Sequence, residues 1–114
     1  MKTREKVLGR EHKDTASSYH NLASLYYQLE KFNQAEPLYK NALIIREKIL
    51  VKSHPDIAHS YNGLGFVYLQ LEEYNQAYIL LNKAFKLFQE IYNPEHEKMH
   101  FIREILEVLE SEIL

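Results

Sequence analysis

Two consecutive stretches repeat each other: residues 12–53 read HKDTASSYHNLASLYYQLEKFNQAEPLYKNALIIREKILVKS, and residues 54–95 read HPDIAHSYNGLGFVYLQLEEYNQAYILLNKAFKLFQEIYNPE. Placed one over the other, they share residues along their whole length, from His12 over His54 to Ile49 over Ile91. This period of 42 residues predicts two copies of one structural unit that stack on each other.

The sequence outside the two copies also follows the period. REKVLGREH, which ends at His12, overlays REKILVKSH, which ends at His54, so residues 1–11 are interpreted as the tail of a preceding repeat. The copy that begins at His96 keeps little of the pattern beyond Leu106. We therefore expect a single domain over residues 1–114, with repeat one at 12–53, repeat two at 54–95 and a capping helix at 96–114.

Within each copy the apolar residues recur at steps of three and four, which is the spacing of one helix face. The first stripe predicts a helix over residues 14–29 and the second its partner, so each repeat is expected to form an antiparallel helical hairpin in an all-α fold. The stripes consist of Ala16, Tyr19, Leu22, Ala23, Tyr26 and Leu29, and of Ala35, Leu38, Tyr39, Ala42, Ile45 and Ile49.

Short polar side chains stand near the expected helix starts. Asp14 and Asp56 are candidate N-caps of the first helices, and Asn33 and Asn75 of the second, because a side-chain oxygen can accept a backbone N–H that has no partner there. Glu36, three residues after Asn33, would complete a capping box. Pro37 is then expected in the first turn, where its missing N–H costs no hydrogen bond.

Composition and charge restrict the function. With 14 basic against 16 acidic residues and no basic cluster, nucleic acid is not an expected partner. No apolar run is long enough for a membrane span and no signal-peptide core precedes the repeats. The absence of cysteine excludes thiolate metal sites and suits a reducing compartment, so a cytoplasmic location is expected.

The repeats resemble the tetratricopeptide repeat, in the 42-residue form that is similar to kinesin light chain repeats. Tyr19-x2-Leu22-Ala23-x2-Tyr26, followed by Ala35, Tyr39 and Ala42, matches the family signature, as do Tyr61, Leu64, Gly65, Tyr68, Ala77, Leu81 and Ala84 in the second copy. The strings AEPLYKNAL and REKIL are similar to the kinesin light chain subtype in particular. The family's late proline is replaced by Glu47 and Gln89.

The resemblance implies a right-handed superhelical stack whose concave groove, formed by the first helix of each repeat, binds a peptide or helix of another protein without a cofactor. Asn and Gln amides there suit the backbone of an extended peptide, and Tyr27, Phe66 and Leu69 offer apolar contacts. The groove contains no Lys or Arg, which argues against a carboxylate clamp; Lys40, Lys83 and Lys86 are placed on the convex, solvated side. Its predicted residues are Ser17, His20, Asn21, Ser24, Tyr27, Gln28, His59, Asn62, Phe66, Leu69 and Gln70.

The last segment has its own pattern. Ile102, Leu106, Leu109 and Ile113 recur at helical steps among glutamates, which is typical of a capping helix that is apolar toward the stack and acidic toward water. An acidic amphipathic helix for a partner is the alternative.

Two other functions stay open at this point. One is weak self-association through exposed repeat ends, with Val7 and Leu8 as an apolar edge. The other is a metal-dependent peptidase, because His96-Glu97-Lys98-Met99-His100 matches H-E-x-x-H. The repeat already explains His96, and only 14 residues follow His100, although Glu104 is a conceivable third ligand. The sequence therefore favours a non-catalytic binding module with no metal.

Overall fold

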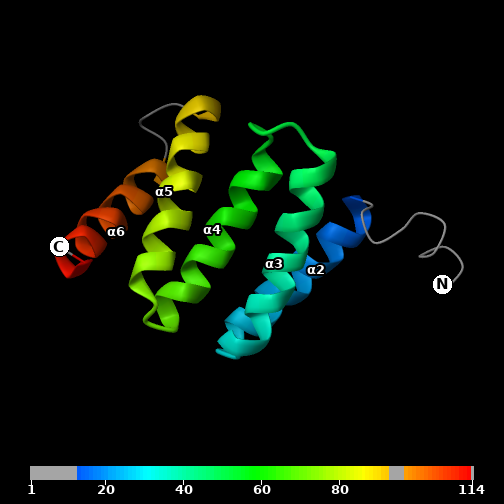
Figure 1. Cartoon of the computed structure of the whole chain (residues 1–114), viewed down its shortest axis with the longest axis horizontal. Helices are drawn as coiled ribbons and strands as arrows, with labels where there is room; N and C mark the ends of the chain where they lie inside the picture. The colour runs from blue at the N-terminus through cyan, green and yellow to red at the C-terminus, as the bar shows by residue number, and fades with distance from the viewer. Residues whose placement is uncertain (1–12, 93–96, 114) are drawn as a thin grey trace, which may run out of the picture.

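The computed structural model describes residues 13–92 and 97–113. Over these residues it contains helices and no strand, which confirms the predicted all-α fold (Figure 1). The helices are α2 (Lys13–Gln28), α3 (Phe32–Ile49), α4 (Pro55–Gln70), α5 (Tyr74–Ile91) and α6 (Glu97–Ile113). The predicted tail at residues 1–11 and the end of repeat two at residues 93–95 lie outside the described residues, as does His96.

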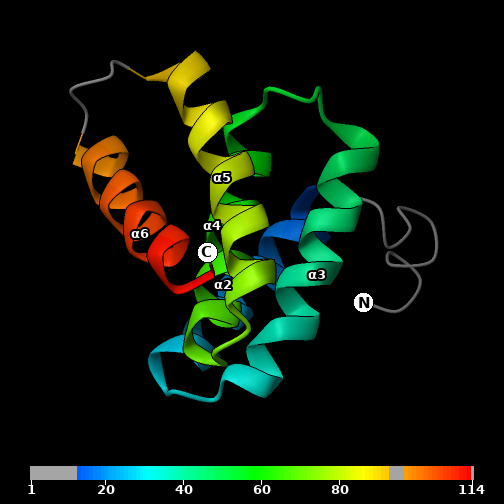
Figure 2. The same cartoon turned by 60° about the vertical axis from the view of Figure 1, so that its left-hand side comes forward.

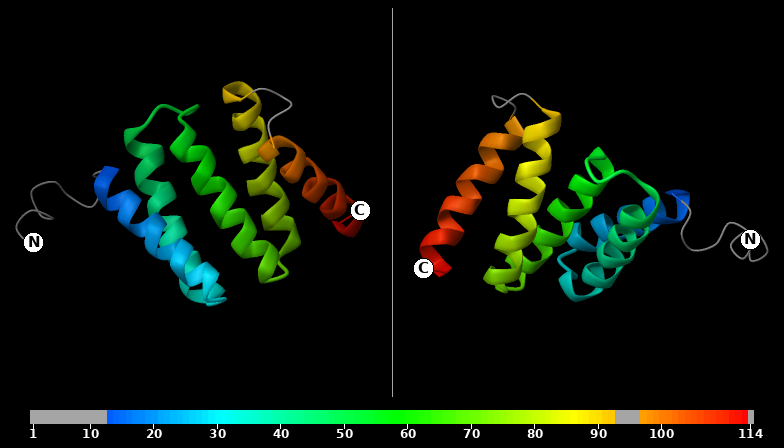
Figure 3. Two further views of the ribbon diagram at one scale, coloured as in Figure 1. Left: turned by 180° about the vertical axis from the view of Figure 1, so that it is seen from behind. Right: turned by 45° about the horizontal axis from the view of Figure 1, so that its top comes forward.

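The helices form a stack in which each packs on its neighbours in the chain. α2 packs on α3, α3 on α4, α4 on α5 and α5 on α6, and α2 also contacts α4. Consecutive helices run in opposite directions, as Figures 1 and 2 show, so α2–α3 and α4–α5 are two antiparallel hairpins. α3 and α5 face the viewer in Figure 1, whereas α2, α4 and α6 follow one another across the face seen from behind in Figure 3.

Small residues allow the helices to approach closely. The signature alanines are fully buried in both repeats, and larger side chains from the facing helix pack beside them. Tyr39 of repeat one and Leu81 of repeat two occupy the same repeat position, and they are 5% and 0% exposed. The fully buried alanines are Ala16, Ala23, Ala35, Ala42, Ala58, Ala77 and Ala84.

One face of α2 is exposed although its counterpart in repeat two is buried. Leu22 is 42% exposed and Leu25 is 50% exposed. The residues at the same repeat positions, Leu64 and Val67, are 3% and 0% exposed because α3 covers this side of α4. The prediction of one buried stripe from Ala16 to Leu29 is therefore wrong for its leucines, because no described helix covers that side of α2.

The predicted N-caps of α3, α4 and α5 are also wrong. α4 is capped by His54, whose Nδ1 accepts the backbone N–H of Asp56 at 3.0 Å, and Pro55 is its first residue. α3 begins after Lys31 and α5 after Glu73, neither of which makes a side-chain capping bond. Asp14 follows Lys13 inside the described part of α2. Each of these three helices begins two residues earlier than the predicted polar cap would place it.

The earlier start of α3 changes the roles of Glu36 and Pro37. Pro37 lies beyond the first turn, where it cannot donate the N–H that the Asn33 carbonyl would accept. Glu36 forms no capping box; its Oε2 accepts the hydroxyl of Tyr68 at 2.8 Å and lies 3.3 Å from Lys40 Nζ. Glu36 thus links the two hairpins rather than capping its own helix.

α6 has the amphipathic character expected of a capping helix. Met99, Ile102, Leu106 and Leu109 are buried against the stack, and its glutamates are exposed. The Tyr78 hydroxyl of α5 donates to Glu110 Oε2 at 2.9 Å. Among the described residues, no helix is both long and apolar enough to cross a bilayer.

A candidate binding groove on the first helices

A hollow of about 400 Å³ opens on the face formed by α2, α4 and α6, which is the face seen from behind in Figure 3. We call it the first-helix groove. Side chains from all three helices line it, together with Tyr39, which reaches it from α3. The lining residues are His20, Ser24, Tyr27, Tyr39, His59, Asn62, Gly63, Phe66 and Phe101.

The structure brings together about half of the predicted groove residues. His20, Ser24 and Tyr27 of α2 lie in it, as do His59, Asn62 and Phe66 of α4. Of the others, Ser17 is half-buried, and Asn21, Gln28 and Gln70 are exposed outside the lining. Gln70 reaches the groove residue Tyr27 through an Nε2–hydroxyl contact of 3.4 Å. Leu69 lines a separate hollow of about 360 Å³ against α6.

Sequence reasoning missed Phe101, Tyr39 and Gly63 in the lining. Phe101 comes from α6, where the repeat pattern is lost, so no repeat position assigned it to the groove. Tyr39 was assigned to the core, and it is indeed 5% exposed. A Cβ on Gly63 would lie 2.6 Å from Tyr39 Cε1, so only glycine lets this ring rest on α4. The signal in the sequence was Gly63 itself, one turn after His59 in the middle of α4.

A buried arginine lies beneath the groove. Arg46 of α3 is 6% exposed, and its NH1 donates to Ser60 Oγ at 2.9 Å and to the Asp56 carbonyl at 3.2 Å. The same nitrogen lies 3.3 Å from His20 Nδ1. A guanidinium can only donate, so Nδ1 accepts and the imidazole proton stands on Nε2. Lys and Arg are absent from the described lining, but Arg46 makes the floor behind His20 cationic.

This surrounding keeps His20 neutral. Burial and the positive charge of Arg46, with a smaller contribution from His59, lower the pKa of His20 from 6.5 to about 4. The ring also meets Tyr39 edge-on, with centroids 5.1 Å apart. Tyr39 is held in turn by its hydroxyl, which lies 2.9 Å from Ser24 Oγ, and burial raises the pKa of the Tyr39 phenol. His20 is therefore a fixed N–H donor at the groove surface.

Asn62 supplies a hydrogen-bond acceptor to this groove. Its Oδ1 is buried and has no hydrogen-bond donor among the described residues. A buried carbonyl oxygen without a donor costs about 1–3 kcal/mol. The groove therefore has both a fixed donor and an acceptor that lacks its partner.

Aromatic rings form the walls on either side of these polar groups. Phe66 of α4 and Phe101 of α6 stack with centroids 5.8 Å apart, and Phe101 stays 56% exposed. At the other end Tyr27 meets Phe32 edge-on at 5.2 Å. The arrangement suits a ligand with apolar side chains on an extended backbone.

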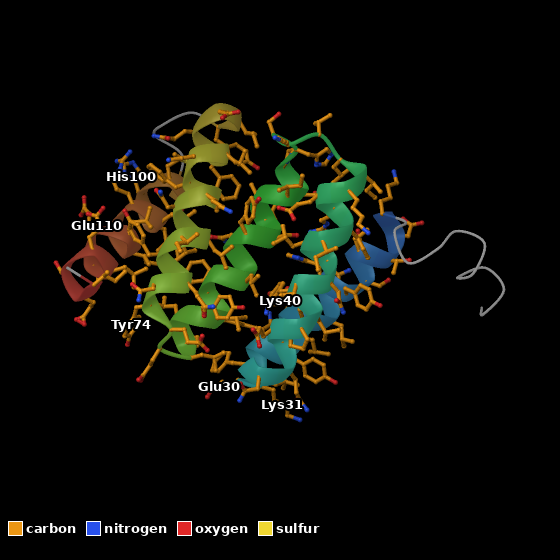
Figure 4. The ribbon with its side chains drawn as sticks, viewed as in Figure 1. Glu30, Lys31, Lys40, Tyr74, His100 and Glu110 are labelled. Carbon is orange, nitrogen blue, oxygen red and sulfur yellow. The ribbon has the colours of Figure 1, made fainter. Side chains whose placement is uncertain are left out.

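The H-E-x-x-H motif receives no support as a metal centre. His96 lies outside the described residues, and Glu97 and His100 are exposed at the start of α6 (Figure 4). Over the described ranges, no group of three His, Asp or Glu side chains is placed to hold a metal ion.

Comparison with known proteins identifies the family and the fold of the helical stack. The family model described as "Tetratricopeptide repeat" matches residues 1–48 and 14–90. Solved structures with the same fold include one described as kinesin light chain nearly identical TPR-like repeats from Podosopora anserina, at 23% identity and a TM-score of 0.83. Another is BtubC (BKLC) from P. vanneervenii, at 23% identity and a TM-score of 0.78.

The two structures differ from this chain in length. The match to the first structure covers 94% of this chain and 51% of that one. The match to the second covers 90% of this chain and 41% of that one. This chain therefore spans about half the length of these proteins or less. No curated protein sequence matches.

Proposed function

Because this chain belongs to the tetratricopeptide repeat family, whose fold generally mediates protein–protein interaction, we propose that the first-helix groove binds an extended segment of a partner protein. The family is typically non-catalytic, and we infer a binding module rather than an enzyme. We also place the repeat units at residues 12–53 and 54–95, since each contains one complete hairpin, and propose a cytoplasmic location.

The observation that carries the proposal is that His20 and Asn62 line one hollow, with His20 Nδ1 held by Arg46 and Asn62 Oδ1 without a donor among the described residues. A peptide backbone offers N–H and C=O groups in alternation, so one extended segment offers a donor to Asn62 and an acceptor to His20. A small apolar ligand would leave Asn62 Oδ1 unpaired. The pairing therefore favours a polypeptide over a lipid or a hydrocarbon.

The apolar walls add to binding without fixing the sequence of the ligand. Phe66 and Phe101 together present a stacked aromatic surface, and Tyr27 closes the other end. Large side chains that cover these rings would bury apolar area at about 25 cal/mol per Å². We expect ligands with apolar residues spaced along an extended stretch.

The test is a selection of peptides from a displayed random library on the immobilised chain. Selected peptides are then titrated against the purified chain and the variants Phe66→Ala and Asn62→Ala. We expect each variant to weaken binding by about fivefold or more, since each removes a partner worth about 1–3 kcal/mol.

Ile79→Ala is the matched control, because Ile79 is 54% exposed on α5, away from the groove. Peptides that bind all four proteins equally would refute the groove assignment. Far-ultraviolet circular dichroism separates this outcome from unfolding of a variant.

A second candidate function is self-association through the end of the stack. The exposed leucine face of α2, formed by Leu22 and Leu25, favours it, because Leu64 and Val67 at the same positions of α4 are covered by α3. Light scattering over a range of concentrations tests it. A mass above that of the monomer that falls on Leu25→Ser would support the candidate, and a constant monomer mass would refute it.

A further inference from the structure

A second hollow, of about 390 Å³, opens between α3 and α5 on the side opposite the first-helix groove. These two helices make no contact with each other within the described ranges, and α4 lies between them (Figure 1). The floor is apolar, with Ile57 of α4 at 3% exposure and Leu87 of α5 half-buried. Lys40 marks the α3 side of this face in Figure 4.

The rim of this hollow carries an excess of positive charge. Lys52, Lys83 and Lys86 line it, and none of the three forms an ion pair with a described residue. Lys83 Nζ lies 5.5 Å from the centroid of the Tyr61 ring. Among the described lining residues Glu47 is the one acidic side chain, and its Oε2 already accepts the Tyr61 hydroxyl at 2.8 Å. We call this site the lysine-rimmed groove.

The outer face of α6 has the complementary character. Val108 is 62% exposed, with Glu104 and Glu112 one turn away on either side and Glu107 next to it, all exposed. The guanidinium of Arg103 does not offset them on this face, because it lies over the Phe85 ring of α5 at 5.6 Å. Val108 therefore stands among three carboxylates, on the side of α6 that also borders the hollow lined by Leu69 and Tyr74.

We propose that the outer face of α6 of one copy docks into the lysine-rimmed groove of a second copy. Val108 would meet the apolar floor at Ile57 and Leu87, and the surrounding glutamates would meet the three lysines. The two surfaces differ, so the contact is head-to-tail and adds copies as concentration rises, unless it closes into a ring. A contact through one helix face falls below about 1,200 Å², which is typical of weak complexes.

The experiment is sedimentation equilibrium of the full chain at increasing concentration and at two salt concentrations. At about 0.01 M salt, where the Debye length is about 30 Å, we expect the average mass to rise above 13.6 kDa with concentration. At about 1 M salt, where it is about 3 Å, the mass should return to the monomer value.

Charge reversal identifies the surfaces. Lys83→Glu/Lys86→Glu and Glu104→Lys/Glu107→Lys should each stay monomeric at low salt. An equimolar mixture of the two variants should associate again, because every groove then meets an α6 face of opposite charge. Lys13→Glu/Lys31→Glu is the control: it changes the net charge as much as the first variant, but both residues lie outside the lysine-rimmed groove.

Three results would overturn the proposal. The chain could stay monomeric at low salt, the mixture of reversed variants could fail to associate, or association could persist in both variants and disappear in Leu25→Ser. The last result would assign the contact to the leucine face of α2 instead. None of these results contradicts peptide binding in the first-helix groove, because that binding is measured separately, with monomeric protein.

Discussion

At the scale of single residues, the two repeats solve one packing problem differently. Ala23 and Gly65 occupy the same repeat position, and each faces the second helix of its hairpin. Ala23 is fully buried, in the same core cluster as Tyr39. At Gly65 an added Cβ would lie 2.8 Å from Leu81 Cγ and 3.3 Å from the Leu81 backbone nitrogen. A methyl group that fits between α2 and α3 thus has no room between α4 and α5.

Gly65→Ala is therefore expected to lower stability. Overpacking costs about 1–3 kcal/mol, which exceeds the gain of about 1 kcal/mol in helix propensity. Urea unfolding followed by circular dichroism measures the difference. The opposite change, Ala23→Gly, should also destabilise, because it loses propensity and a buried methyl. A rise in the unfolding midpoint of Gly65→Ala would contradict the close approach of α4 and α5.

His20 makes stability depend on pH. Its folded pKa of about 4 lies below the unfolded value of 6.5, so between these values the unfolded chain binds a proton that the folded chain does not. The free energy of unfolding should therefore fall as pH is lowered through this window. His20→Asn keeps an acceptor for Arg46 but does not titrate, and it should lose this part of the pH dependence. Parallel urea-midpoint profiles between about pH 7 and pH 4 would contradict the burial of a neutral imidazole.

At the scale of the elements, both hairpin turns use a strained residue. Glu30 and Glu72 occupy the same repeat position after the first helix, with φ of 61° and 63°. Their backbone N–H groups donate to the carbonyl oxygens of Tyr27 and Leu69 at 2.9 and 3.1 Å. The left-handed conformation ends each first helix and reverses the chain.

Glu72→Gly should stabilise the fold. A side chain in this conformation costs about 1–2 kcal/mol, against about 0.5–1 kcal/mol for the greater freedom of unfolded glycine. We expect a gain of a few tenths to about 1 kcal/mol in thermal or urea unfolding. Glu73→Gly, one residue further, is the control, because φ there is −94° and glycine offers no relief. A loss of stability in Glu72→Gly would show that the Glu72 side chain contributes more than its strain.

The two helical hairpins and their order could be predicted from the sequence, because apolar residues recur at the spacing of a helix face. Helix starts could not, because the cap depends on tertiary context. His54 caps α4 through its ring nitrogen, which composition-based preferences for Ser, Thr, Asp and Asn do not anticipate. Glu36 likewise suits a capping box locally, but a tyrosine of the next repeat takes its carboxylate.

At the scale of the whole molecule, the repeat provides its own control for stacking energy. Leu64 and Leu22 share a repeat position, at 3% and 42% exposure. Leu64→Ala should cost about 2–5 kcal/mol, because it opens a cavity between α3 and α4. Leu22→Ala removes the same atoms from an open surface and should cost clearly less. Equal losses of unfolding free energy in the two variants would contradict the coverage of α4 by α3.

The groove was predictable only where the repeat continues. Residues of α2 and α4 were assigned from their repeat positions, and the structure places six of them in the lining. Phe101 comes from a helix that has lost the pattern, and Arg46 acts from behind the face. Periodicity identifies which side of a helix faces inward, but it does not show which charge lies under a polar side chain or which rings a divergent last helix contributes.

The stacking of Phe101 on Phe66 gives the last helix a further property. α6 packs on one helix, α5, and Phe101 joins it to Phe66 of the groove wall. Because it has few neighbours, the amide hydrogens of α6 should exchange fastest with solvent through local opening. A bound peptide segment that covers Phe66 and Phe101 would hold α4 and α6 together. Slower deuterium uptake in residues 97–113 would then report occupancy of a site that lies mainly on two other helices.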